Sequence, residues 1–408
     1  MERVCGCIAT SPISISIGRK YEAVLREILR EIDPSSKWIG IVHEPRGIEG
    51  CELLVVLIAT GGTEHIVLKL SENTRYMALI YHRYNNSLPA LLEVLPVLRE
   101  KELFIELIPY TGDQRELREE LKKLVKAYRV VKELQGLRLG IVGGISDWLV
   151  YSRVDPDRVR EKLGIDLVYV PLKKIYNEYK RTSVSENEYR DLVEKARRIK
   201  ISSDNIRDAY KLYKAISKII EEYGLAGYTI KCFDLIPVLN TTACLAVSLM
   251  NTSGRIIAGC EGDVPSMLTM LLLNRVSNKP VFMGNIAWIN RESVLIAHCT
   301  APIISEYKLY THFESDKGVG ISVEYPIGEK VTIARLSPDL EMLRAGIGEI
   351  VETKWSTGLC RTQVKIKLRN PKKIIRESIG NHYALVVGDY LEPLKDIARF
   401  LDIKVDEI

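Results

Sequence analysis

Acidic, amide and histidine side chains follow apolar runs in the second half of the chain, and their types and spacing suit metal-ion chemistry. Residues 256–260 form an apolar run that is followed directly by a turn with Glu261 and Asp263. A helical pattern then leads to a second apolar run that ends at Asn285. In open α/β sheets ligands bind beyond the carboxyl ends of the strands, so this order predicts that the three side chains converge on one crevice. Two carboxylates and an amide oxygen there suggest a divalent cation.

Four short motifs in this half of the chain resemble the L-fucose and L-arabinose isomerase superfamily. They are Glu-Gly-Asp at 261–263, Pro-Val-Phe-Met-Gly-Asn at 280–285, Ala-His-Cys at 297–299 and Gly-Asn-His at 380–382. The resemblance implies an aldose–ketose isomerase that uses Mn²⁺ or another divalent cation. The implied metal ligands are Glu261, Asn285 and His382, with His298 matching a histidine of the arabinose branch.

Asn285 departs from the family pattern, because the family has a carboxylate at this position. An amide oxygen can bind Mn²⁺, but it brings no charge and cannot act as a base. Glu261 is then the carboxylate expected to move a proton between C1 and C2 of the sugar, while Asp263 either shuttles a proton or orients a ligand histidine. Two interpretations follow. One is a sugar isomerase, and the other is a non-catalytic sugar-binding or regulatory protein, or a different metal-dependent sugar enzyme, on the same fold.

Five further side chains are candidates for contacts with the substrate. Three lie in polar turns of the N-terminal third, where they either recognise hydroxyl groups or belong to ordinary turns and helix caps. The family resemblance implies that this part of the chain reaches over the metal site of a neighbouring subunit. A tryptophan after a later strand either lines the crevice or packs, and a histidine near a Gly-Val-Gly run either touches substrate or closes a hairpin. The candidates are His65, His82, Asn86, Trp148 and His312.

The hydrophobic pattern predicts three domains. Residues 1–135 alternate apolar runs with helical patterns, which favours a doubly wound parallel sheet and a possible lid that acts in trans. Residues 136–302 repeat this rhythm and carry the turns of the metal site. Residues 303–408 contain short β runs separated by Gly and Pro, and a closing helix, which favours a β-rich, barrel-like domain. The expected fold class is therefore α/β, with two parallel-sheet domains before the barrel.

Composition narrows the classes of function. Lys and Arg number 58 and Asp and Glu 53, so the net charge is only +5 and nucleic-acid binding is not indicated. No apolar run is long enough for a membrane span and the N-terminus does not resemble a signal peptide, so we expect a cytoplasmic protein. The eight cysteines are expected to be reduced thiols. Abundant Lys, Glu and Ile with few Gln suggests a thermophile.

The expected partner is a small-molecule sugar or sugar phosphate. Since the resemblance implies active sites shared between subunits, a homotrimer or homohexamer is expected, in a closed cyclic assembly.

Overall fold

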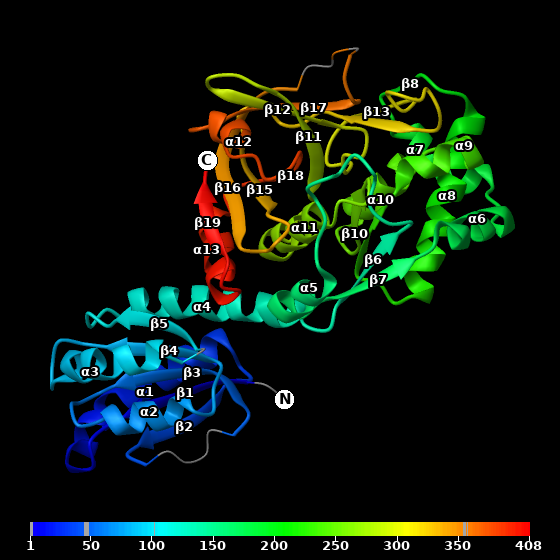
Figure 1. Ribbon diagram of the computed structural model, residues 1–408. Helices are drawn as coiled ribbons and strands as arrows, with labels where there is room; N and C mark the ends of the chain where they lie inside the picture. Colours follow the sequence, from blue (N-terminus) through cyan, green and yellow to red (C-terminus); the bar gives the residue numbers. More distant parts are fainter. Residues whose placement is uncertain (1–2, 45–48, 102, 354–355, 357) are drawn as a thin grey trace. The chain divides into compact units, whose positions relative to one another are not determined.

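The computed structural model describes residues 3–44, 49–101, 103–353, 356 and 358–408 of the 408-residue chain. The chain divides into two compact units, Met1–Arg129 and Val130–Ile408, which we call unit 1 and unit 2. Figure 1 shows both units, coloured along the sequence. None of the described helices combines the length and the apolar character that crossing a membrane requires.

Unit 1 is a five-stranded parallel sheet in the order β2-β1-β3-β4-β5. Its central strands are apolar on both faces because helices cover them; α1 packs against β1 and β2, and α3 against β3 and β4. The boundary between the two units falls within α4. The elements are β1 Arg3–Ala9, η1 Pro12–Ser14, α1 Ile15–Ile32, β2 Lys37–Val42, β3 Cys51–Ile58, α2 Glu64–Ser71, β4 Tyr76–Tyr81, α3 Ser87–Arg99, β5 Phe104–Pro109 and α4 Gln114–Leu134.

One disulfide bond contradicts the expectation that all cysteines are reduced. Cys5 and Cys51 are bonded, with their Cα atoms 5.6 Å apart. The two residues are 46 positions apart in sequence, but β1 and β3 are neighbouring strands, so the pairing of these strands brings the sulfur atoms together. The free thiols are Cys7, Cys232, Cys244, Cys260, Cys299 and Cys360.

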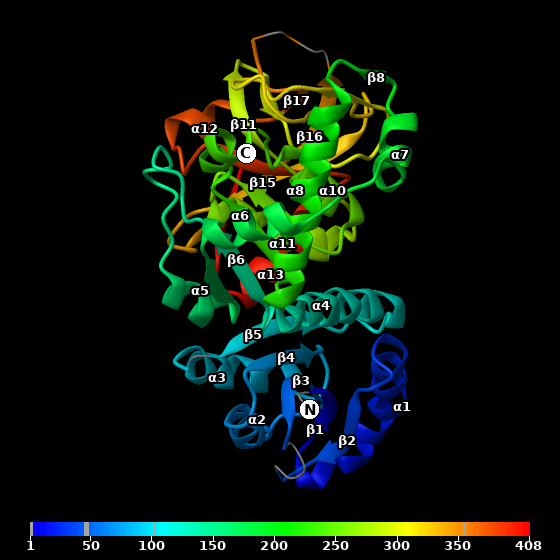
Figure 2. The ribbon, with the colours of Figure 1, turned by 90° about the vertical axis from the view of Figure 1, so that its right-hand side faces the viewer.

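Unit 2 begins with a four-stranded parallel sheet in the order β10-β9-β6-β7. Helices α6 and α10 each pack against α8, and Figure 2 shows these three helices close together. The elements of this part are β6 Arg138–Val142, α5 Pro156–Leu163, β7 Asp166–Val170, α6 Leu172–Arg181, α7 Glu186–Glu194, β8 Arg198–Ile199, α8 Ser203–Glu222, β9 Gly227–Ile230, η2 Cys232–Leu235, α9 Ile236–Leu239, α10 Cys244–Ser253, β10 Ile257–Cys260 and α11 Val264–Ser277.

The second part of unit 2 is a closed antiparallel barrel. Its strands run in the order β15-β18-β11-β12-β17-β16, and β16 pairs back with β15 to close the ring. Closure satisfies the backbone groups that an open edge would expose. The elements are β11 Phe282–Ile289, β12 Ser293–His298, β13 Tyr307–Tyr310, β14 Gly320–Val323, β15 Lys330–Leu336, β16 Met342–Glu352, β17 Thr362–Lys367, α12 Lys372–Arg376, β18 His382–Val387, α13 Leu391–Phe400 and β19 Lys404–Glu407.

The fold class expected from the sequence, parallel α/β sheets followed by a barrel, is confirmed. One detail was wrong: the run that ends at Asn285 does not continue the parallel sheet. It is the start of β11, which pairs antiparallel with β12 and β18 inside the barrel. Only residues 290–292 separate β11 from β12, and so short a connection permits a hairpin but no parallel crossover.

Helix α11 lies between the two sheets of unit 2. It packs against β9 and β10 of the parallel sheet and against β15 and β18 of the barrel. Nearly all of its side chains are buried, as expected for a helix that is apolar on every face. Its N-terminus therefore lies where the end of β10 meets the barrel. Two smaller pieces complete unit 2, namely the sheet β14-β13-β8 and strand β19, which runs parallel to β16.

Two aromatic residues on β11 provide a test of the barrel core. Phe282 is fully buried and its ring centroid lies 5.7 Å from that of Tyr325, whereas Trp288 on the same strand is 65% exposed. We expect Phe282→Ala to lower the free energy of unfolding by about 3–5 kcal/mol, because it leaves a cavity. The control Trp288→Ala should change it by about 0.5 kcal/mol. Urea denaturation measures both, and equal effects would contradict the barrel packing.

Candidate active site

Glu261 directly follows β10 and occupies a strained turn. Its φ is 60°, in the left-handed region that side chains other than glycine rarely adopt, and Gly262 follows with a φ of 73°. Backbone hydrogen bonds hold the turn, from Gly262 N–H to the Ile230 carbonyl and from Asp263 N–H to the Cys260 carbonyl. Strain of this kind is often found at functional sites, where the surrounding structure maintains it.

The structure brings Glu261 together with two histidines from the barrel. Its Oε1 lies 3.5 Å from Nε2 of His298, at the end of β12, and 3.5 Å from Nε2 of His382, at the start of β18. All three side chains are buried, and one ligand atom from each lies within 4.8 Å of the others. These spacings fit three donors around one divalent cation.

The second ring nitrogen of each histidine has its own partner. Nδ1 of His382 lies 2.9 Å from Oδ2 of Asp263, and Nδ1 of His298 lies 2.8 Å from the Thr300 hydroxyl. Metal-binding histidines are commonly held in this way, since the outer hydrogen bond sets the ring orientation. Nε2 of His382 is buried and has no hydrogen-bond partner among the described residues. The donor set therefore fits a metal ion such as Mn²⁺, which accepts carboxylate and imidazole ligands.

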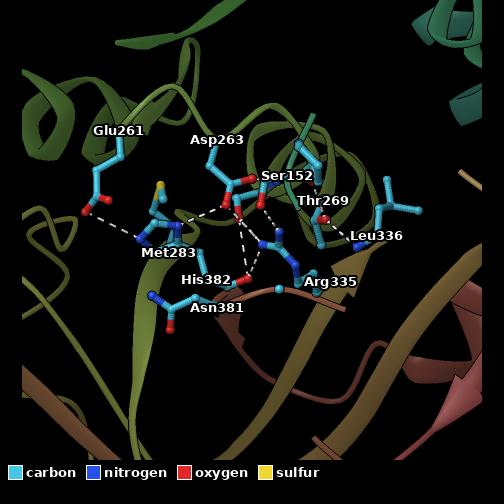
Figure 3. A network of polar contacts seen from close by, with 12 residues as sticks. Ser152, Glu261, Asp263, Thr269, Met283, Arg335, Leu336, Asn381 and His382 are labelled. Carbon is cyan, nitrogen blue, oxygen red and sulfur yellow. Dashed lines mark hydrogen bonds and ion pairs between the residues drawn. The ribbon is translucent and has the colours of Figure 1, made fainter. Parts of the chain in front are cut away.

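Asp263 is fully buried and connects this group to Arg335 (Figure 3). Its Oδ1 caps α11 by accepting the Ser266 N–H at 2.9 Å, while Oδ2 faces both His382 and the Arg335 guanidinium at 3.1 Å. Arg335, on β15, also donates to the carbonyls of Ile379 and His382 and to the hydroxyls of Ser152 and Ser266. A buried carboxylate needs such compensation, because it has lost its hydration.

The ionisation of these groups is mutually dependent. Burial raises the pKa of Glu261, but His382 and His298 outweigh it and hold this pKa well below its usual range. Burial also raises the pKa of Asp263, yet Arg335 and His382 lower it to about 2. Burial lowers the pKa of His382, whereas Glu261 and Asp263 raise it to about 9. The site thus stabilises positive charge next to two carboxylates.

Trp148 and His312 also lie near Glu261, and Phe233 connects them. The Trp148 indole N–H donates to Glu261 Oε2 at 2.7 Å, and the Trp148 ring packs edge to face on Phe233 with centroids 5.0 Å apart. Phe233 packs in the same way on His312, at 5.5 Å. Burial, together with His298 and Arg361, lowers the pKa of His312 to about 4, so this imidazole is neutral at pH 7. A neutral imidazole can donate a hydrogen bond to a sugar hydroxyl through its N–H, or accept one through its other nitrogen.

Asn285 lies beside the site on β11, opposite His382 in the antiparallel register. Its Oδ1 accepts a hydrogen bond from the Asn381 side chain, whose own Oδ1 accepts the Ile286 N–H at 3.2 Å. The amide oxygen predicted to bind a metal is thus engaged with a neighbouring amide. Its role as a ligand stays a prediction.

The three candidates in unit 1 lie in two neighbouring turns or at the start of the helix that follows one of them. His82 follows β4, is buried, and stacks on Tyr21 with ring centroids 4.9 Å apart. Asn86 precedes α3 in a left-handed conformation, while His65 is exposed on α2. The Gly61 N–H donates to the Asn85 carbonyl at 2.8 Å, which joins the two turns. Their contact with a substrate in another subunit stays a prediction.

Arg335 and Phe233 were not recognised from the sequence. A signal for Arg335 existed, because it is the one charged residue within the apolar run 331–336 of β15, where a buried strand normally excludes charge. Phe233 gave no comparable signal. Its place beside Trp148 depends on the packing of η2 against the loop after β6.

Comparison with known proteins identifies relatives with one shared name. A sulfoquinovose isomerase of Alkalicoccus urumqiensis is 24% identical over 317 residues, which cover 72% of this chain and 70% of that protein. One of Priestia megaterium is 24% identical over 314 residues, 72% of this chain and 69% of the relative. One of Clostridium sp. is 21% identical over 305 residues, 69% and 67% of the two chains. No family model matches the chain. These relatives support a sugar isomerase family and indicate an enzyme of the aldose–ketose isomerase class, as the sequence predicted.

The pairing of Asp263 with Arg335 predicts a loss of stability in acid. The pKa of Asp263 is lowered from 3.8 to about 2 in the folded protein. The ionised carboxylate therefore stabilises the folded state at pH values above 3.8, the pKa in the unfolded chain, and this contribution is lost as the pH falls through about 2. We expect Asp263→Asn to cost about 3–5 kcal/mol at pH 7, because Arg335 is left buried without its carboxylate. The difference in the free energy of unfolding between this variant and the wild type should shrink between pH 4 and pH 2. Urea denaturation with EDTA present measures it.

A matched control for this measurement is Asp402→Asn, at an exposed position that asparagine also tolerates. The control should follow the wild type at every pH. An Asp263→Asn variant with wild-type stability at pH 7 would contradict the proposed compensation.

Proposed function

We propose that the protein is a divalent-cation-dependent aldose–ketose isomerase in which Glu261, His298 and His382 hold the cation. The observation that carries the proposal is the convergence of one carboxylate from the turn after β10 with two imidazoles from β12 and β18. When bound, the cation supplies electrostatic stabilisation of the negative charge that develops on the sugar oxygens. Mn²⁺ is the first ion to test.

Glu261 and Asp263 have different roles in this proposal. Glu261 is ionised, which is the form that a general base requires. Both oxygens of Asp263 are occupied, and the side chain is fully buried. Of the two roles expected for Asp263, orienting His382 fits these contacts better than moving a proton, because a shuttle needs access to the substrate.

His312 and Phe233 are proposed to line the place of the sugar. His312 is neutral and its Nδ1 lies 3.0 Å from the Ser315 hydroxyl, so its ring orientation is set by the turn between β13 and β14. His312 therefore stabilises the turn of this hairpin and also lies near the proposed metal ligands. Phe233 offers an apolar edge for the carbon face of a sugar.

The substrate proposed is a small sugar, and the names of the relatives make sulfoquinovose the first one to test. A sugar phosphate is the second candidate. The proposed assembly remains a trimer or hexamer in which the turns with His65, His82 and Asn86 serve a neighbouring subunit.

Glu261→Gln tests the function directly. The change keeps the shape of the side chain and removes its charge, so we expect loss of Mn²⁺ binding and of isomerisation together. Calorimetry measures the ion, and conversion of sulfoquinovose to its ketose measures the reaction. The control Glu349→Gln removes a charge from an exposed residue of β16 and should behave as wild type. A wild-type protein that binds the sugar without converting it would favour the non-catalytic interpretation.

Asn285→Asp tests whether Asn285 is a ligand. A formal charge replaces a neutral oxygen at nearly constant shape, and the Asn381 amide can still donate to it. We expect Mn²⁺ to bind about 10-fold more tightly, since charge is a main determinant of affinity for hard cations. Asn370→Asp adds the same charge at an exposed position and serves as control. Unchanged affinity in Asn285→Asp would exclude this residue as a ligand.

A further inference from the structure

The connection between β6 and α5 is tied to the candidate site at three points. The Ser146 N–H donates to the Glu261 carbonyl at 3.0 Å, and the Trp148 indole N–H donates to Glu261 Oε2 at 2.7 Å. Further along, the Ser152 hydroxyl accepts from Arg335 at 2.8 Å. Residues 143–152 thus take their position from Glu261 and Arg335, two of the residues that build the site.

Close backbone contact also fixes this loop against the Glu261 turn. A Cβ atom on Gly262 would lie 2.3 Å from the Gly144 carbonyl oxygen and 2.7 Å from the Ile145 Cα. Gly262 also has a φ of 73°, so glycine is required there for two reasons. The approach of loop and turn is therefore determined by the backbone and does not depend on Trp148 alone.

The two oxygens of Glu261 have different surroundings. Oε1 faces the Nε2 atoms of His298 and His382, at 3.5 Å each, while Oε2 accepts the Trp148 indole N–H. The terminal torsion of a glutamate is broad, so without a partner for Oε2 the carboxylate could rotate. Trp148 is 51% exposed, yet its polar atom points to a buried carboxylate and its ring is braced by Phe233.

We infer that Trp148 is a positioning residue whose indole N–H holds Oε2 of Glu261, so that Oε1 is directed at the two histidines and at the cation they would share. This inference rests on the proposed role of Glu261 as a metal ligand. An indole N–H is a donor that carries no charge, so it orients the carboxylate without neutralising it. A Lys or Arg in the same place would orient Glu261 and also compete with the cation for its charge.

A matched pair of variants tests the inference. Trp148→Phe removes the N–H and keeps an aromatic ring against Phe233. Trp38→Phe in unit 1 is the control, because Trp38 Nε1 also donates to a glutamate, Glu22, at 3.2 Å. Partners of a metal-binding side chain change affinity by about 10- to 100-fold when they are removed. We expect Mn²⁺ affinity, measured by calorimetry, to fall by about that factor in Trp148→Phe and to stay at the wild-type value in the control.

Steady-state kinetics separate positioning from simple contact with the sugar. If Trp148 acts through Glu261, kcat should fall in Trp148→Phe, and added Mn²⁺ should restore part of it. If Trp148 only provides a surface for the sugar, KM rises while Mn²⁺ affinity is unchanged, and the inference is overturned.

Wild-type protein that binds no Mn²⁺ would refute the proposed metal site itself and with it the role of Trp148. Binding by wild type with equal affinity in Trp148→Phe would refute the inference alone.

Hydrogen exchange of the indole N–H gives a readout that needs no metal. Trp148 and Trp288 are both largely exposed, at 51% and 65%. We expect the Trp148 indole N–H to exchange more slowly by NMR, with Glu261→Ala bringing it to the rate of Trp288. The Trp148→Phe spectrum assigns the signal. Equal rates for the two indoles in the wild type would overturn the inference, whatever the metal measurements show.

Discussion

The buried carboxylate of Asp263 is the point on which unit 2 depends. It caps α11 through the Ser266 N–H, holds His382 through Nδ1 and pairs with Arg335 from the barrel. A buried charge is tolerated only when its partners compensate the loss of hydration. These partners come from α11 and from the barrel strands β18 and β15, and the Asp263 N–H donates to the carbonyl of Cys260 at the end of β10. The contacts of this one residue therefore connect the parallel sheet, the central helix and the barrel.

This constraint also explains why the proposed metal ligands are placed so closely. α11 packs on both sheets, and its capping residue is two positions after Glu261. Fixing Asp263 therefore fixes the turn that carries Glu261, while the same carboxylate orients the His382 ring. His298 arrives independently from β12, where the Thr300 hydroxyl holds its Nδ1. The arrangement is rigid because each side chain is held by a second contact.

The charges of the site balance within a short distance. Glu261 and Asp263 are negative, and Arg335 with a protonated His382 offsets them. Arg335 is bound by carbonyls, hydroxyls and Asp263, so its charge serves the fold. The imidazole nitrogens that face Glu261 are the groups left for a ligand, and a cation would bind His382 Nε2 by displacing its proton. The ion pair between Asp263 and Arg335 thus has a structural role, whereas Glu261 and the two histidines form the group able to bind a cation.

The sequence by itself determined the order of apolar runs, and with it the parallel sheets and the β-rich C-terminal part. It also indicated Glu261 and the late histidines, because polar residues directly after buried strands are visible as breaks in the apolar pattern. These features are local, since hydrophobic periodicity is set by residues a few positions apart. The small set of histidines, six in the chain, further limited the candidates.

Only the tertiary structure decided which strands pair and which side chains meet. The strand that carries Asn285 belongs to the barrel, Cys5 is bonded to Cys51, and Arg335 reaches Asp263 across 72 positions of sequence. No local pattern encodes such contacts, because they depend on closure of the barrel and on the packing of α11 between two sheets. The partner of Trp148 was undecided for the same reason: its indole meets Glu261 only because the loop after β6 folds onto a glycine turn 113 positions away.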